Sequence, residues 1–246
     1  MALQQSTANV PKTGIVLAAG LGKRMHPITQ PMPKPMVRVQ GKPMLDRALD
    51  ALDGTGVEKA VVNVHHLAEQ IETHIETRIS PAIEISDERE QLLDSGGGVK
   101  NALPILGDNP FYVLNGDSFW IEGTRPNLQH MSEYWNAQEM DILLLLANMT
   151  EAVGFDGKGD FQMDENGRLE RRNELEIAPF AYAGAAIMKP ELFDDTPDKP
   201  FSLNLLFDRA LEQGRLFGLR LDGLWLHVGT PEAIREAEEA IARSAA

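Results

Sequence analysis

LAAGLGKRMHPITQPMPKPMV, the stretch Leu17–Val37, completes a short apolar run and continues as a long loop rich in proline and basic residues. The run GIVLAA, Gly14–Ala19, is short, continuous and apolar, which predicts a buried strand. In parallel α/β sheets, ligands bind beyond the carboxyl ends of the strands. The loop that leaves this first strand is therefore the first candidate for a binding site.

The loop combines two glycines with two neighbouring cations. Gly20 and Gly22 let backbone N–H groups approach a ligand closely, because no side chain intervenes. Arg24 can hold two phosphate oxygens at once, whereas Lys23 acts as a point charge. A solvated basic surface loop is the simpler interpretation of a lone GxG.

Lys34 stands between Pro33 and Pro35, which restrict its backbone. A cation held in this way suits a transferring phosphoryl group, whose oxygens gain charge in the transition state. Two familiar phosphate motifs do not fit. The Walker pattern GxxxxGK[ST] is absent, and Met25 occupies the place of the third glycine of GxGxxG.

Apolar runs alternate with helical patterns through the first half of the chain. We expect strands at 14–19, 59–66, 82–86, 111–117 and 141–147, and helices at 43–52, 67–79 and 128–137, with a short helix that ends near Pro104. This alternation predicts an α/β fold: a Rossmann-like, mixed, mostly parallel sheet with helices on both faces.

The second half of the chain predicts a hairpin and a closing helix. Asn166–Gly167 is a strong turn signal, and Thr230 followed by Pro231 is typical of a helix start. We expect a flexible tail at residues 1–12 and a single domain at residues 13–246. The tail lacks the pattern of a signal peptide.

Composition narrows the function classes. The chain has 246 residues, no cysteine and a formal net charge of −14. The absence of cysteine excludes disulfides and thiolate chemistry, and agrees with a cytoplasmic enzyme. The acidic balance argues against nucleic-acid binding. No run approaches the roughly 18 apolar residues of a membrane span, so no membrane partner is expected.

The string LAAGLGKRMHPITQPMPKPMVRVQGKPM, Leu17–Met44, resembles the signature of the sugar-1-phosphate nucleotidyltransferases, LAAGxGxRMxPLTxxxPKPxxxVxxxPM/L. Ile28 replaces the usual leucine. Further motifs follow in family order, namely HH, LLDSGGG, NGD, GDF and VGTPE. The resemblance covers nearly the whole chain and implies the GT-A-like nucleotidyltransferase fold without a C-terminal β-helix.

The resemblance implies a reaction between a nucleoside triphosphate and a sugar 1-phosphate, with release of pyrophosphate and Mg²⁺ as the cofactor. Among the short members, the chain is most similar to the N-acetylmuramate-1-phosphate uridylyltransferases of cell-wall recycling, which implies UTP and N-acetylmuramic acid 1-phosphate. Alternatives are an enzyme like the mannose-1-phosphate guanylyltransferases or the phosphocholine cytidylyltransferases, and a non-catalytic module that binds a nucleotide sugar. The sequence does not predict an oligomeric state.

The resemblance also assigns residues. It implies three catalytic cations, namely Lys23, Arg24 and Lys34. It implies a nucleotide-binding set formed by Leu17, Ala19, Gly20, Gly22, Gln91, Gly96, Gly97 and Asn115, in which Gln91 is the candidate for reading the base. It places Asn148, Gly159, Asp160 and His227 beside the sugar phosphate.

Asp117 follows an apolar strand in the tripeptide NGD, where a carboxylate can hold Mg²⁺. The same tripeptide is typical of a simple turn, and the resemblance favours the metal ligand. His227 is a departure from the family, which commonly has an acidic residue before VGT. Imidazole is a poor Mg²⁺ ligand, so we expect either a weakened metal site, a substitute carboxylate or a lost site.

Overall fold

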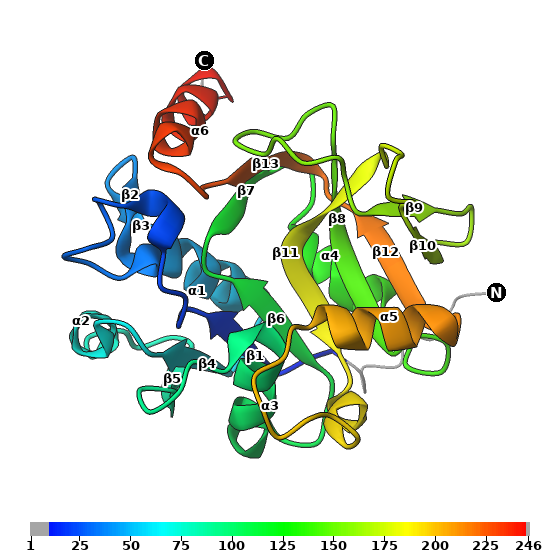
Figure 1. Cartoon of the computed structure of the whole chain (residues 1–246), viewed down its shortest axis with the longest axis horizontal. Helices are drawn as coiled ribbons and strands as arrows, with labels where there is room; N and C mark the ends of the chain where they lie inside the picture. Colours follow the sequence, from blue (N-terminus) through cyan, green and yellow to red (C-terminus); the bar gives the residue numbers. More distant parts are fainter. Residues whose placement is uncertain (1–9, 245–246) are drawn as a thin grey trace.

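The computed structural model describes residues 10–244, so most of the predicted tail lies outside the described residues. This part of the chain is built around a nine-stranded sheet with the main order β10-β9-β11-β6-β1-β4-β5, to which β8 and β12 are added beside β11 (Figure 1). The mixed, mostly parallel sheet predicted from the sequence is confirmed.

Four parallel strands form the first half of the sheet; three come from buried apolar runs, and the edge strand β5 alternates apolar and polar residues. They are β1 (Thr13–Leu17), β4 (Lys59–Val64), β5 (Ala82–Asp87) and β6 (Phe111–Asn115). Their carboxyl ends therefore meet at one edge of the sheet. Leu17 lies between Asn63 and Asn115 in the register, which brings three loops together at this edge.

One antiparallel strand joins this half to the rest of the sheet. β11 (Phe180–Met188) pairs with β6 on one side and with β8 (Ile142–Asn148) on the other, and β12 (Leu216–Arg220) runs parallel to β8. The hairpin of β9 (Phe161–Met163) and β10 (Leu169–Arg171) turns at Gly167, whose φ is 85°. The hairpin predicted at this turn is confirmed.

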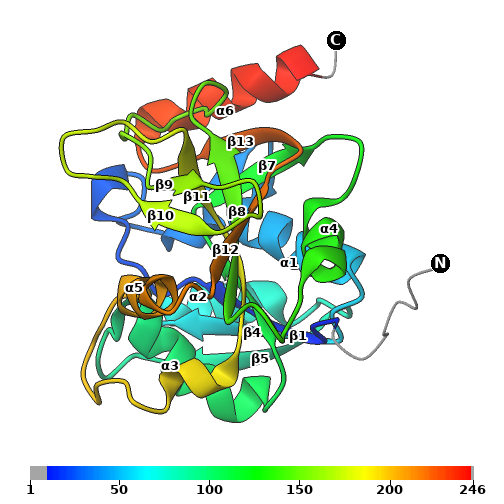
Figure 2. The ribbon, with the colours of Figure 1, turned by 90° about the vertical axis from the view of Figure 1, so that its right-hand side faces the viewer.

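Helices cover both faces of the sheet, as predicted (Figure 2). One face is packed against α1 (Met44–Gly54), α2 (Ala68–Ile75) and α4 (Asn127–Tyr134), and the other against α3 (Asp94–Leu106) and α5 (Asn204–Glu212). The apolar strands thus bury side chains on both faces. None of the helices in residues 10–244 is long and apolar enough to cross a membrane.

A smaller layer lies beside the main sheet and packs around a third apolar cluster. It contains the two-stranded sheets β7 (Ser118–Glu122) with β13 (Gly223–His227) and β2 (Arg38–Val39) with β3 (Lys42–Pro43), together with α6 (Pro231–Ser244). Three short 3₁₀ helices complete the described part, at Lys23–Met25, Lys34–Met36 and Pro190–Phe193. Thr230 caps α6 through its side chain, as predicted.

One prediction is refined and one strand was missed. The helix expected to end near Pro104 is α3, which ends at Leu106, where the Gly107 amide donates a hydrogen bond to the Leu103 carbonyl. Pro104 lies in the last turn of α3, so the backbone hydrogen bond that proline cannot donate is missing only at the end of the helix. The strand β7 was not predicted, because its sequence SFWIE is short and has no clear alternation.

Candidate active site

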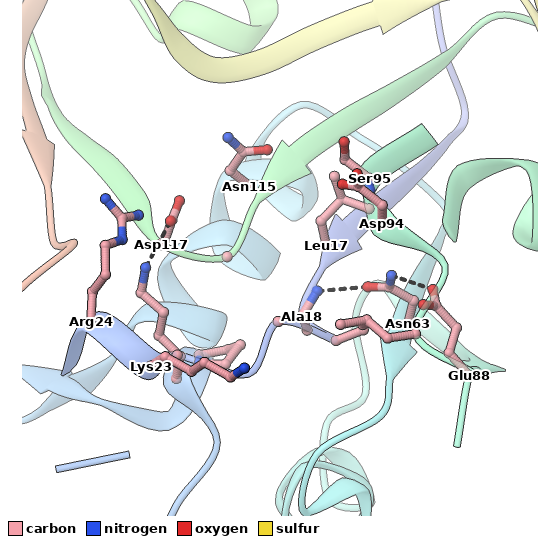
Figure 3. Close-up of a pocket in the computed structure, with 17 residues that line it drawn as sticks. Leu17, Ala18, Lys23, Arg24, Asn63, Glu88, Asp94, Ser95, Asn115 and Asp117 are labelled. Carbon is pink, nitrogen blue, oxygen red and sulfur yellow. Dashed lines mark hydrogen bonds and ion pairs between the residues drawn. The ribbon is translucent and has the colours of Figure 1, made fainter. Parts of the chain in front are cut away.

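A cleft with a volume of about 630 Å³ opens at the carboxyl edge of the parallel strands (Figure 3). It is lined by Leu17, Ala18, Ala19, Gly20, Gly22, Lys23, Arg24, Lys34, Pro35, Asn63, Glu88, Leu92, Asp94, Ser95, Asn115, Gly116 and Asp117. The volume lies within the range of small-molecule sites. The lining comes from the first loop, from the ends of β4, β5 and β6, and from the start of α3.

The cleft has two chemically different ends, which Figure 3 separates clearly. Arg24 and Asp117 lie at one end, whereas Asn63, Glu88 and Ser95 lie at the other. A bound molecule that spans the cleft would therefore meet cations and Asp117 at one end, and a polar wall with the carboxylates of Glu88 and Asp94 at the other.

The first loop owes its shape to glycine. Gly22 has φ of 62°, and a Cβ there would lie 3.1 Å from the Cβ atoms of Lys34 and Thr29. The Thr29 hydroxyl donates to the Gly22 carbonyl at 2.8 Å, which folds the loop back on itself. Gly20 is different, because no atom lies within 4 Å of the place of its Cβ. The loop is thus tightly packed at Gly22 and open to the cleft at Gly20.

Lys34 and Asp117 form an ion pair on the floor of the cleft. Lys34 Nζ lies 2.8 Å from Asp117 Oδ2, and the two side chains are 10% and 26% exposed. Burial alone would raise the pKa of Asp117, but the charges of Lys34 and Arg24, together with His227 when it is protonated at acidic pH, outweigh burial and lower the pKa. Asp117 is therefore an anion at neutral pH.

The site offers limited but suitable chemistry for a divalent metal. Within residues 10–244, no group of three or more His, Asp or Glu side chains is arranged to hold an ion. Mg²⁺ in nucleotide sites is commonly held by one or two carboxylates together with substrate phosphates and water. Asp117 Oδ1 accepts no hydrogen bond from the described residues, so it is available as such a ligand. The residues fit a metal that is held largely by the substrate.

Among the lining residues that the sequence analysis missed, Asn63 and Glu88 are two buried polar side chains. They are 2% and 3% exposed. Asn63 Oδ1 accepts from the Ala18 amide at 2.6 Å, and Asn63 Nδ2 donates to Glu88 Oε1 at 2.6 Å. A signal was present, since Asn63 is the polar residue within the apolar strand KAVVNV and Glu88 directly follows β5.

The predicted nucleotide-binding residues fall into two groups. Leu17, Ala19, Gly20, Gly22 and Asn115 line the cleft. Gln91 is exposed outside the lining, and Gly96 and Gly97 are buried and donate their amides to the Phe201 carbonyl at 2.8 and 3.1 Å. The roles of these three in nucleotide binding stay predictions. Leu92, Asp94 and Ser95, just before the glycines, are the residues of this segment that line the cleft.

The four predicted sugar-phosphate residues do not line the cleft. Asn148 ends β8 and accepts from the Thr150 amide at 3.2 Å, and Asp160 Oδ2 accepts from the Tyr182 amide at 2.9 Å. Gly159 has φ of 75° beside Ala178. These residues support the carboxyl edge of the sheet, and their contact with a sugar stays a prediction.

His227 ends β13 opposite Ser118, the residue that follows the metal candidate Asp117. Its ring packs edge-on against Phe155, with centroids 5.8 Å apart. Burial lowers the pKa of His227, and Lys34 and Arg24 lower it further, although Asp117 opposes them. The imidazole is thus neutral at pH 7 and adds no charge to the site.

Comparisons with known proteins agree on one family. The model of the family described as "Nucleotidyl transferase" matches residues 13–244. An N-acetylmuramate alpha-1-phosphate uridylyltransferase of Caulobacter vibrioides is 44% identical over 241 residues, covering 96% of this chain and 100% of that protein. The enzyme of the same name from Neisseria meningitidis serogroup B is 31% identical, with 91% and 96% covered.

A solved structure shares the fold at low sequence identity. The crystal structure of UDP-glucose pyrophosphorylase complexed with UDP-glucose matches with a TM-score of 0.78 and 18% identity, over 95% of this chain and 99% of that chain. At this identity the match supports the architecture alone.

Proposed function

Because the chain belongs to the nucleotidyl transferase family, we propose that it joins UTP to N-acetylmuramic acid 1-phosphate and releases pyrophosphate. The observation that carries the substrate pair is the 44% identity to the Caulobacter uridylyltransferase over that protein's whole length. We place the reaction in the cytoplasm, in the recycling of cell-wall sugars, without a nucleic-acid or membrane partner.

The reaction needs no protein nucleophile. An oxygen of the sugar phosphate attacks the α-phosphorus of the nucleotide in line, a new P–O bond forms, and the bond to the β-phosphate breaks as pyrophosphate leaves. Catalysis of this type depends on positioning and on neutralising charge. The cationic end of the cleft, with Lys23, Arg24 and Lys34, supports this assignment.

The cations have separate tasks in the proposed reaction. Lys23 and Arg24 lie on the exposed rim and hold the β- and γ-phosphates, which become the leaving group. Lys34 lies deeper, with 10% of its side chain exposed, and faces the α-phosphate. A cation with so little freedom stabilises the negative charge that develops on the phosphoryl oxygens.

We assign Mg²⁺ to Asp117, because its carboxylate is an anion with one free oxygen at the cationic end of the cleft. When bound, the ion neutralises phosphate charge and orients the two substrates. Lys34 is paired with Asp117 through one contact, and its ammonium group has three donors, so it can contact a phosphate oxygen while it stays beside the carboxylate.

The nucleobase occupies the opposite end of the cleft in this proposal, beside Asn63, Glu88 and Ser95. Gln91 is exposed outside the cleft, so we expect Asn63, Glu88 and Ser95, rather than Gln91, to lie beside the base. The sugar lies toward β11 and the loops that contain Asn148, Gly159, Asp160 and His227.

A pyrophosphate-release assay tests the proposal. The protein is incubated with each of the four nucleoside triphosphates and a panel of sugar 1-phosphates at millimolar Mg²⁺. We expect release with UTP and N-acetylmuramic acid 1-phosphate. Preference for GTP with mannose 1-phosphate would support the guanylyltransferase alternative, and preference for CTP with phosphocholine the cytidylyltransferase one. No release from any pair would support the non-catalytic module.

Asp117→Asn is the matched negative variant for this assay. It removes the anionic metal ligand and keeps the size of the side chain, so we expect the loss of metal-dependent pyrophosphate release in a folded protein. A circular dichroism spectrum and a melting curve check the fold. Retention of most activity at ordinary Mg²⁺ would show that Asp117 is not the metal ligand.

A further inference from the structure

A chain of three hydrogen bonds, two buried and one partly buried, joins the two loops that form the base end of the cleft. The Ala18 amide donates to Asn63 Oδ1 at 2.6 Å, Asn63 Nδ2 donates to Glu88 Oε1 at 2.6 Å, and the Leu93 amide donates to Glu88 Oε2 at 3.1 Å. Figure 3 shows the first two bonds as dashed lines. Ala18 belongs to the first loop, and Leu93 immediately precedes α3.

The direction of each bond is fixed by chemistry. Backbone amides can only donate, so Asn63 has to turn its oxygen to Ala18 and Glu88 has to turn an oxygen to Leu93. The Asn63 nitrogen then faces the remaining Glu88 oxygen, where a donor meets an acceptor. Any change that turns one of these groups around leaves a buried polar atom without a partner, which is costly.

The surroundings leave this network little room to rearrange. A Cβ at Gly98 would lie 2.6 Å from Glu88 Oε1 and 2.7 Å from Asn63 Nδ2, so the glycine permits the close packing of α3 over the pair. Burial raises the pKa of Glu88, although its hydrogen bonds to Asn63 and Leu93 oppose this. Burying a carboxylate lowers the stability of the fold unless its oxygens are hydrogen-bonded, which makes these hydrogen bonds important here.

We propose that Asn63 and Glu88 are positioning residues that hold the first loop and the loop before α3 at a fixed separation, and so set the width of the nucleobase end of the cleft. They act through the Ala18 and Leu93 amides. This inference rests on the proposed function, because it assigns the base to this end of the cleft.

A swap of donor and acceptor tests the network. Asn63→Asp places two acceptors against each other, and Glu88→Gln leaves one donor facing another donor whichever way the new amide turns. The double variant, Asn63→Asp with Glu88→Gln, restores every bond. Its new carboxylate accepts from the Ala18 amide and from the nitrogen of the new side-chain amide, whose oxygen accepts from the Leu93 amide. The double variant has the charge and nearly the shape of the wild type.

We expect each single variant to weaken UTP binding by about 10-fold or more, since each leaves a buried polar group unpaired. The KM for the sugar 1-phosphate should stay within about twofold, because the network does not extend to that side. The double variant should recover the UTP affinity to within about threefold of the wild type. Affinity is measured by calorimetry and KM by pyrophosphate release.

Asn127 provides a matched control elsewhere in the fold. Asn127 Oδ1 accepts from the Asp222 amide at 2.8 Å, and its Nδ2 donates to Glu122 Oε2 at 2.5 Å, which repeats the arrangement at Asn63. Asn127 is fully buried and does not line the cleft. Asn127→Asp should therefore lower the melting temperature and leave the UTP affinity and both KM values unchanged.

Several results would overturn the inference. A folded double variant that stays as weak as the single variants would show that the bond pattern does not position the loops. A change of base preference in the double variant would show that Glu88 reads the base directly. If the wild type binds UTP but releases no pyrophosphate, the proposed function fails while the affinity comparison still tests the network. If the wild type binds no nucleotide at all, both fail.

Discussion

The two glycine-rich segments of this protein look alike in sequence and differ in structure. In the first loop, Gly20 faces open space in the cleft. In the second segment, Gly96 and Gly98 are buried, and a Cβ at Gly96 would lie 2.4 Å from the Phe201 ring. Glycine in the first loop therefore gives a ligand access to the backbone, whereas glycine in the second lets a helix pack closely.

The comparison shows why a glycine run cannot be assigned to a ligand from its composition alone. Both segments follow parallel strands and both reach the same edge of the sheet. The first is accompanied by three cations in the cleft, but the second has the amides of Gly96 and Gly97 already bonded to the Phe201 carbonyl. We therefore expect substitutions of side chains in the first loop to lower the catalytic rate, and substitutions of glycines in the second segment to lower the free energy of unfolding.

The largest expected effect is the loss of turnover in Lys34→Ala. Removing one preorganised contact to the transition state lowers kcat by roughly 10²–10³. Nucleotide affinity should fall much less, because Lys23 and Arg24 remain. Steady-state kinetics with both substrates varied will separate the two effects. An unchanged kcat with weaker nucleotide binding would make Lys34 a binding group only.

Gly96→Ala should have the next largest effect, and it should be on folding. The added methyl group meets the Phe201 side chain at 2.4 Å and the Phe201 carbonyl oxygen at 2.9 Å. Overpacking of this kind lowers the free energy of unfolding by about 1–3 kcal/mol. Urea unfolding measures this change. A variant as stable as the wild type would mean that Phe201 moves away freely.

Gly20→Ala should affect substrate binding rather than stability, and the effect should be smaller than that of Gly96→Ala. The position has room for a methyl group and its φ is not positive, so the free energy of unfolding should change by less than about 0.5 kcal/mol. The methyl group would stand where the nucleotide approaches the loop, and the KM for UTP should rise a few-fold. If Gly20→Ala destabilised the fold as much as Gly96→Ala, the contrast between the two segments would be lost.

The smallest expected effect is on the pH dependence of stability. The pKa of Asp117 is lowered in the folded state, so its stabilising contribution is present above its unfolded pKa and is lost as the pH falls through the folded pKa. The pKa of Glu88 is raised, so its contribution becomes more favourable as the pH falls from above its folded pKa to below its unfolded one. Urea unfolding of the wild type, Asp117→Asn and Glu88→Gln at several pH values measures each difference. Parallel curves for all three proteins would contradict both directions.

Much of the fold was predictable because β1, β4, β6 and β8 are continuous apolar runs that are buried on both faces. The first loop was also predictable as part of the cleft, because its residues are contiguous and follow β1 directly. Residues brought together by pairing between distant strands were harder to predict. Asn63 and Glu88 are 25 residues apart, and no local pattern reports that their side chains meet.

The residues predicted beside the sugar phosphate show the same limit of prediction from the sequence. Asp160 is held by the amide of Tyr182 in a different strand, and His227 comes near Asp117 only through the pairing of β13 with β7. No pattern in the sequence predicted β7, so the surroundings of His227 could not be derived. Spacing identifies such residues as candidates, but only the sheet register places them in space.

The position of β11 has a consequence for how the chain folds during synthesis. Among the described strands, β11 alone connects the half that contains β1 and β6 with the half that contains β8 and β12. The apolar strand β8, ILLLLAN, leaves the ribosome well before β11 does, as their ranges Ile142–Asn148 and Phe180–Met188 show. Until β11 arrives, β8 has no partner in the sheet and exposes an edge that is prone to aggregate. The nascent chain therefore passes through a stage in which β1, β4, β5 and β6 can pair while β8 still lacks both of its partner strands.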